Sequence, residues 1–114
     1  MPFNPVPPQS YSGSRTEITS DYQATPTDSF IAVVGFSVQG APAAPITIGL
    51  PDPMEYGPGD LVVKDESGQA SAGLPITLSP PVGFMIDGAA AGVLIAGAYG
   101  FVRLYSSGAQ WFTR

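Results

Sequence analysis

Short apolar runs separated by turn residues follow one another through most of the chain. Apolar and polar side chains alternate most clearly at residues 46–50 and 101–105. In the second run Phe101, Arg103 and Tyr105 share one face, because successive side chains of a strand point to opposite sides. A period of two residues is typical of β-strands, and no segment has a persuasive helical period. We therefore predict an all-β protein.

The spacing of these runs predicts a small antiparallel sandwich or a barrel-like module. Strands are expected about every 8 to 14 residues, at 29–38, 46–50, 60–65, 74–79, 84–86, 93–96, 99–105 and 110–113. Turn residues separate them, and the segments 65–68 (DESG) and 106–108 (SSG) each end in a glycine that tolerates positive φ. Such turns are typical of hairpins, which join antiparallel neighbours.

The first 20 residues have a different pattern, without hydrophobic periodicity. Prolines at positions 2, 5, 7 and 8 fix φ and remove backbone donors. We predict an extended arm over residues 1–20, followed by a β-rich domain over residues 21–114. Four isolated apolar side chains suit an arm that inserts single anchors into grooves on a neighbouring subunit, and they are Phe3, Val6, Tyr11 and Ile18. The alternative is a tail with no partner.

Charge and side-chain chemistry exclude several classes of function. Nine acidic residues against four scattered basic ones give a net charge of −5, so we expect no binding of nucleic acid, which requires clustered Lys and Arg. The chain has no His and no Cys, which removes the commonest general base, thiol nucleophiles and the usual ligands of transition metals. We therefore predict no enzymatic activity, no cofactor and no metal.

The acidic residues leave two other chemistries to weigh. A pair of carboxylates can hydrolyse glycosides, and Asp65, Glu66 or Asp87 can offer oxygen ligands to calcium. These acids lie in predicted turns, where solvated carboxylates that cap the turn are ordinary. Turn capping is therefore the interpretation that we prefer.

The run 88–100 (GAAAGVLIAGAYG) is the most informative segment for assembly. The apolar stretch 89–102 is interrupted by glycines and is shorter than the roughly 18 residues of a membrane-spanning helix, so we expect no membrane span. On an exposed sheet edge its apolar centre would promote aggregation, whereas a subunit interface would protect it. The residues predicted to form that interface are Val93, Leu94, Ile95 and Tyr99. The alternative is an interior strand of a monomeric sandwich.

An ordered series of short motifs resembles a small β module of tailed-bacteriophage virion proteins. The series is ITIGLP at 46–51, KDESGQA at 64–70, ITL at 76–78, IDG at 86–88 and LYSSGAQW at 104–111. The similarity extends over residues 22–113, while the loop at 51–59 and the run at 89–98 depart from the pattern. Members of that group are capsid-decoration, head-fibre and tail-fibre components, usually trimeric and without catalytic residues.

The resemblance implies a structural role in the virion. We expect a bacteriophage capsid-decoration (cement) or head-fibre subunit, a homotrimer that docks on the major capsid protein or on other virion proteins. The alternative is a receptor- or glycan-binding module of a tail fibre or tail spike. In that case Tyr105 and Trp111 would supply an aromatic platform for sugars, although packing in the core or at a subunit interface is the commoner use of such rings.

Overall fold

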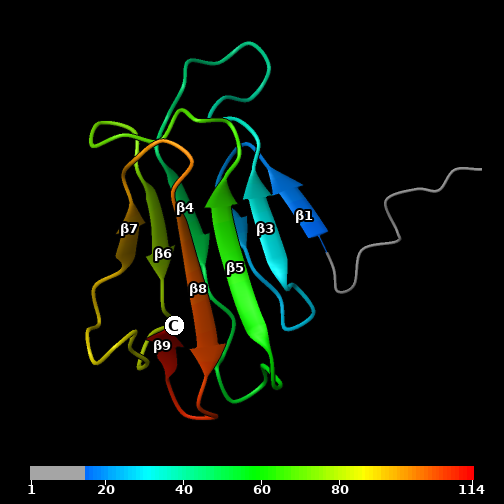
Figure 1. Ribbon diagram of the computed structural model, residues 1–114, viewed down its shortest axis with the longest axis vertical. Helices are drawn as coiled ribbons and strands as arrows, with labels where there is room; N and C mark the ends of the chain where they lie inside the picture. Colours follow the sequence, from blue (N-terminus) through cyan, green and yellow to red (C-terminus); the bar gives the residue numbers. More distant parts are fainter. Residues whose placement is uncertain (1–14) are drawn as a thin grey trace, which may run out of the picture.

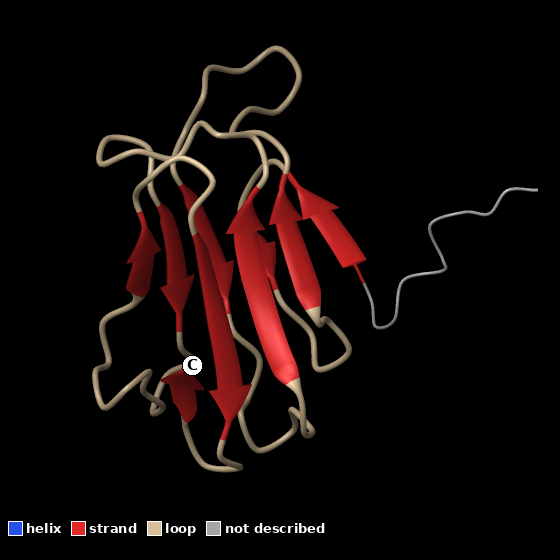
Figure 2. Ribbon diagram, viewed as in Figure 1, coloured by secondary structure: helices blue, strands red, loops and turns tan. Residues whose placement is uncertain are grey.

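The computed structural model describes residues 15–114. These residues form two β-sheets packed face to face, joined by loops (Figures 1 and 2). Sheet A contains, in spatial order, β1 (Arg15–Ile18), β3 (Phe30–Val33), β5 (Asp60–Asp65), β8 (Phe101–Ser106) and β9 (Trp111–Thr113). Sheet B contains, in the same way, β2 (Tyr22–Gln23), β4 (Ile46–Gly49), β6 (Ile76–Ser79) and β7 (Val93–Ile95). Among these residues there is no helix, and hence none that is long and apolar enough to cross a membrane. The predicted all-β sandwich is confirmed.

The chain passes from one sheet to the other after every strand from β1 to β5. Each return to a sheet repeats the direction of the earlier strand, so β1, β3 and β5 are parallel, as are β2, β4 and β6. Antiparallel pairing appears only where β7 joins β6, β8 joins β5 and β9 joins β8. The expectation of antiparallel sheets therefore holds for the last strands only. Turn residues show where a strand ends, but not which layer the next strand joins.

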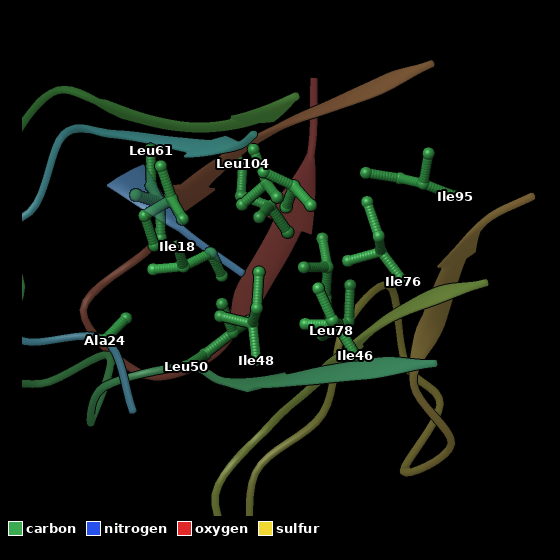
Figure 3. Packing of buried hydrophobic residues seen from close by; sticks show 14 of the residues in the cluster. Ile18, Ala24, Ile46, Ile48, Leu50, Leu61, Ile76, Leu78, Ile95 and Leu104 are labelled. Carbon is green, nitrogen blue, oxygen red and sulfur yellow. The ribbon is translucent and has the colours of Figure 1, made fainter. Parts of the chain in front are cut away.

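Alternate side chains of both sheets meet between the layers and form one core (Figure 3). In β5, for example, Leu61 and Val63 are fully buried, whereas Val62 and Lys64 lie on the outer face. Burial of each large apolar side chain contributes about 1.5–3 kcal/mol. Every strand except β2 adds buried residues to this cluster, which includes Ile18, Ile31, Val33, Ile46, Ile48, Leu61, Val63, Ile76, Leu78, Ile95, Leu104 and Trp111.

Trp111 holds the loop 51–59 against the core. Its ring centroid lies 5.0 Å from that of Tyr56, and its Nε1 donates a hydrogen bond of 2.9 Å to the carbonyl oxygen of Pro51. The hydroxyl of Tyr56 in turn donates to the carbonyl oxygen of Asp28 at 2.6 Å. A loop rich in proline and glycine is thus fixed by two aromatic side chains.

Strand β1 lies within the segment predicted to be an arm. It pairs in parallel with β3, and Ile18 points into the core with 8% of its surface exposed. The sandwich therefore includes residues 15–18, which corrects the predicted boundary at residue 20. Residues 1–14, with the predicted anchors Phe3, Val6 and Tyr11, lie outside the described residues.

The predicted strand at 84–86 is a turn. The amide of Phe84 donates to the carbonyl oxygen of Pro81, and Ile86 makes only isolated bridges, to Ala89 and Trp111. The apolar character of Phe84, Met85 and Ile86 suggested a strand, but only Ile86 of the three is buried.

Candidate binding surface

The outer face of sheet A gathers all four basic residues of the chain together with four aromatic rings. Cross-strand neighbours on this face form three rows: Arg15, Phe30, Val62 and Arg103; Glu17, Ala32, Lys64 and Phe101; and Asp60, Tyr105 and Phe112. Arg114 follows β9, and its amide donates to the carbonyl oxygen of Arg103. We call the surface formed by these rows and Arg114 the cation–aromatic face.

Three of the cations on this face lie over aromatic rings. The guanidinium carbon of Arg15 is 5.7 Å from the ring centroid of Phe30, and Nζ of Lys64 is 5.6 Å from that of Phe101. The guanidinium of Arg114 is 4.3 Å from the ring of Tyr105. Such cation–π contacts contribute about 0.5–1 kcal/mol each at exposed sites. They hold long, otherwise mobile side chains flat on the sheet.

Ion pairs with two glutamates also hold Arg15 in place. Arg15 makes a bidentate pair with Glu66, with Nη1–Oε2 and Nη2–Oε1 distances of 2.9 and 2.8 Å, and a further contact of 3.0 Å with Glu17. The hydrogen bonds to Glu66 and Glu17 raise the pKa of Arg15, and the pair with Arg15 lowers that of Glu66. Exposed pairs of this kind add little to stability. Their effect is to hold these side chains in fixed positions on the face.

A second ion cluster lies at the other side of the face. Asp60 accepts a hydrogen bond of 2.9 Å from Nε of Arg114 and lies 3.8 Å from Nε of Arg103. The ring of Tyr105, under Arg114, also stacks on Phe112 with centroids 5.7 Å apart and an interplanar angle of 24°. Cations therefore lie at both ends of the face, and Lys64 adds a further cation on the central strand β5.

The outer face of sheet B has a different character. Its cross-strand neighbours on β4 and β6 are small and neutral, with Thr47 opposite Thr77 and Gly49 opposite Ser79. Small neutral residues are typical of a solvent-exposed sheet face, whereas aromatic residues and arginine are enriched in protein interfaces. Phe101, with 58% of its surface exposed, is an aromatic ring that the fold of one chain leaves uncovered.

A groove of about 610 Å³ lies beside β2 at the end of sheet B. Two of its lining residues are acidic, Asp21 and Asp52. Each carboxylate already accepts a backbone amide at 2.8 Å, from Thr47 and Met54 respectively. Asp52 therefore caps a local turn, and Asp21 links the segment before β2 to β4, so both carboxylates have structural partners.

Two further carboxylates, of Asp28 and Asp65, are buried. Asp28 accepts hydrogen bonds from the hydroxyls of Thr16 (2.7 Å) and Tyr22 (2.8 Å) and from the amide of Thr25 (2.8 Å). Burial by itself would raise the pKa of Asp28, but these hydrogen bonds outweigh it and hold the pKa below its usual value. The charged form is therefore stabilised, which suits a structural role. Within residues 15–114, no group of three or more acidic side chains is placed to hold a metal ion.

The structure places the sequence-predicted site residues in the core, on the cation–aromatic face, or at exposed positions outside that face. Ile18 is part of the core, so its assignment as a capsid-docking anchor is wrong, because its side chain points between the sheets. Trp111 is fully buried, so its assignment to a glycan platform is also wrong, while the Tyr105 ring lies on the cation–aromatic face, in contact with Phe112 and Arg114.

The predicted interface residues divide in the same way. Ile95 has 3% of its surface exposed and Val93 packs partly against the core, so both side chains point inward, and their role at an interface stays a prediction. Leu94 and Tyr99 are 58% and 59% exposed, and their role at an interface stays a prediction. Side chains alternate along the three-residue edge strand β7, so Leu94 points outward while Val93 and Ile95 point inward.

Sequence reasoning missed the cation–aromatic face as a site. The four basic residues look scattered at positions 15, 64, 103 and 114. The alternation of Phe101, Arg103 and Tyr105 was the one available signal, and the burial pattern of β8 confirms that these residues share the outer face. The pairing of β1, β3, β5 and β8 was needed to bring the other cations beside them.

No protein-family model, no curated protein and no solved structure matches this chain.

Proposed function

We propose that this chain is a non-catalytic structural protein of a bacteriophage particle, a capsid-decoration or head-fibre subunit that docks through the cation–aromatic face. The observation that carries the proposal is the gathering of all four basic residues and four aromatic rings on one flat sheet face. The resemblance of the motifs to virion modules supplies the setting.

Docking through this face requires little reorganisation. The ion pairs of Arg15 with Glu66 and of Arg114 with Asp60 already hold the guanidinium groups in place. Binding surfaces that are ordered beforehand lose less conformational entropy when a partner arrives. The partner meets apolar side chains at Phe30, Val62 and Phe101, and the charges of Lys64 and Arg103 between them select the orientation.

The mechanism that we propose is adhesion between subunits of a shell. Apolar area buried at a contact stabilises it by about 25 cal/mol per Å². A decoration subunit that touches more than one capsid subunit raises the effective concentration at each further contact. The shell is then held together by many modest interfaces.

The acidic side chains support a structural role over a catalytic one. The oxygens of Asp28 and Asp65 already accept hydrogen bonds from neutral donors, and the pKa of each lies below its usual value. A general acid needs the opposite, a carboxyl whose pKa is raised toward the working pH.

The proposal is tested on purified particles of the phage whose genome encodes the chain. We expect the chain in those particles at a fixed ratio to the major capsid protein, by quantitative mass spectrometry. Recombinant chain added to particles that lack it should bind, and Phe101→Ala should weaken binding about 30-fold, since loss of an exposed aromatic anchor at an interface costs about 2 kcal/mol.

The matched control is Val82→Ala, because Val82 is fully exposed but lines the groove beside β2 on the other sheet. This variant should bind like the wild type. Absence of the chain from purified particles would refute the virion role. Equal binding by the Phe101→Ala variant would refute the surface, and binding to host-cell glycans in place of particles would assign the receptor-binding alternative.

A further inference from the structure

The last strands of the two sheets, β9 in sheet A and β7 in sheet B, differ in how their free edges are covered. The outer edge of β9 is closed by the loop 85–89: the amide of Asp87 donates to Trp111, and the amide of Trp111 donates to Met85. The carboxylate of Asp87 also accepts the amide of Thr113 at 2.9 Å. Strand β7 ends sheet B and pairs only with β6, as Figure 1 shows. Among residues 15–114, no backbone hydrogen bond or strand pairing covers its other edge.

Apart from its short length, β7 lacks the features that usually protect an edge strand. Between residues 67 and 102 the chain has a single charged residue, Asp87, and that carboxylate is bound to Thr113. Natural sheets blunt their free edges with charges, prolines or bulges. The outer edge strand β1 of sheet A follows this rule, with Arg15 and Glu17. Strand β7 instead reads Val93-Leu94-Ile95, and Leu94 is 58% exposed.

We infer that two copies of the chain, and not the three that the resemblance implies, associate through β7, pairing edge to edge and antiparallel about a twofold axis centred on Leu94. In that register Leu94 faces Leu94 of the second copy on the outer face. Val93 faces Ile95 of the second copy on the inner face, where both already border the core. Sheet B then continues from one copy into the next.

Charge favours a second copy as the occupant of this edge. Each chain carries a net charge of −5, so two copies repel unless they meet where charge is absent. The segment 67–102, which includes β6, β7 and their loops, carries a single charged residue, Asp87, so a second copy can approach this edge with little charge repulsion. A twofold pairing also makes the strand VLI its own complement, as an isologous interface requires. This inference does not depend on the proposed function.

The first test is the mass of the full chain in solution. We expect a dimer by sedimentation equilibrium at about 100 µM protein, because an interface of one short strand per copy belongs to the weak class. Leu94→Lys should give a monomer at the same concentration, since two ammonium groups would face each other across the axis. Val82→Lys adds the same charge at an exposed position beside β2 and should stay dimeric.

The second test fixes the register by a disulfide. Residues directly opposite each other in an antiparallel pair have Cα atoms about 4.5–5.5 Å apart, within the range of a disulfide. Since the chain has no cysteine, Leu94→Cys under mild oxidation should give a covalent dimer on non-reducing gels. The control Thr77→Cys places a thiol on β6, directly opposite Leu94 but one strand further from the edge. It should stay monomeric on the same gels.

Three outcomes would overturn the inference. They are a monomeric wild type at 100 µM, a trimeric mass, and cross-linking of the Thr77→Cys variant as efficient as that of Leu94→Cys. All these measurements use purified protein without particles, so their failure leaves the proposed docking through the cation–aromatic face untouched.

Discussion

The carboxylate of Asp65 joins three segments of the chain inside the protein. Its Oδ1 accepts the amide and hydroxyl of Ser67, at 3.0 and 2.6 Å, and the amide of Gly68 at 3.1 Å. Its Oδ2 accepts the amides of Ala70 at 3.0 Å and Tyr99 at 3.1 Å. Tyr99 has φ of +62°, a conformation that non-glycine residues adopt rarely. The end of β5, the following turn and the entry to β8 thus depend on one side chain.

Asp65→Asn should destabilise the fold strongly. An amide offers one acceptor oxygen where the carboxylate offers two, and its NH₂ group would face backbone amides. Hydrogen bonds to charged groups contribute about 1.5–3 kcal/mol each, so we expect the free energy of unfolding to fall by about 3 kcal/mol in urea titrations at pH 7. The control Asp21→Asn, at an exposed carboxylate with one bond to Thr47, should cost less than about 1 kcal/mol.

The cost of this substitution should depend on pH. Burial would raise the pKa of Asp65, but hydrogen bonds from Ser67, Ala70 and Tyr99 outweigh it and hold the pKa below the unfolded value. The carboxylate therefore stabilises the fold fully above about pH 4, and this contribution is lost as pH falls through the folded pKa. In urea titrations from pH 7 down to about 2.5, the gap between wild type and Asp65→Asn should narrow. A constant gap would contradict the assignment.

At the scale of elements, β1 is the strand whose contribution is easiest to isolate. It adds buried Ile18, the ion pair of Arg15 with Glu66, and the hydrogen bond from Thr16 to Asp28. Its pairing with β3 also covers backbone groups that would otherwise form a new sheet edge. The segment behaves as part of the sandwich, although its neighbours in sequence suggested an arm.

Two truncations should separate β1 from the residues before it. Removal of residues 1–20 should lower the free energy of unfolding by at least about 3 kcal/mol relative to removal of residues 1–14, because only the longer truncation deletes Ile18 and exposes β3. Thermal unfolding followed by circular dichroism gives the comparison. Equal melting temperatures would show that β1 contributes nothing to the sandwich. The shorter truncation is also the proper one for any test of docking by residues 1–14.

The elements show how far the sequence could be used to predict the fold. The bounds of β5 agree with the predicted strand at 60–65, and β4, β8 and β9 lie within two residues of theirs. Their alternation or their flanking turns are local signals. Strands β1 and β2 were missed because a four-residue and a two-residue strand among polar side chains carry no such signal. Their assignment depends on β3 and β4 beside them.

At the scale of the whole molecule, charge is distributed unevenly between surfaces. The cation–aromatic face carries the four basic residues and three acids that pair with them, Glu17, Asp60 and Glu66. The other six acids lie elsewhere, and the β6–β7 region carries only Asp87. The proposed docking face and the proposed self-pairing edge therefore belong to different sheets and differ in chemistry. One chain can use both at once.

This separation predicts how the two surfaces combine. Leu94→Lys should leave the docking face intact but remove one of two linked binding units, so binding to particles should weaken at least about 10-fold through lost avidity. Phe101→Ala should weaken wild type and Leu94→Lys protein by similar factors, because distant sites act nearly additively. Binding is measured by co-sedimentation with particles over a range of protein concentrations. Undiminished binding of the Leu94→Lys variant would show that self-pairing plays no part in attachment.

The sequence by itself determined the local properties of this protein. A hydrophobic period of two residues predicted the strands and placed Phe101, Arg103 and Tyr105 on one face of β8. The absence of His and Cys restricted the available chemistry. The tertiary structure alone decided that early strands alternate between layers, that Ile18 and Trp111 are buried, and that four distant cations share one face. The reason is physical: the direction of a side chain follows from its own strand, whereas the neighbours of a strand are set by contacts between residues far apart in the chain.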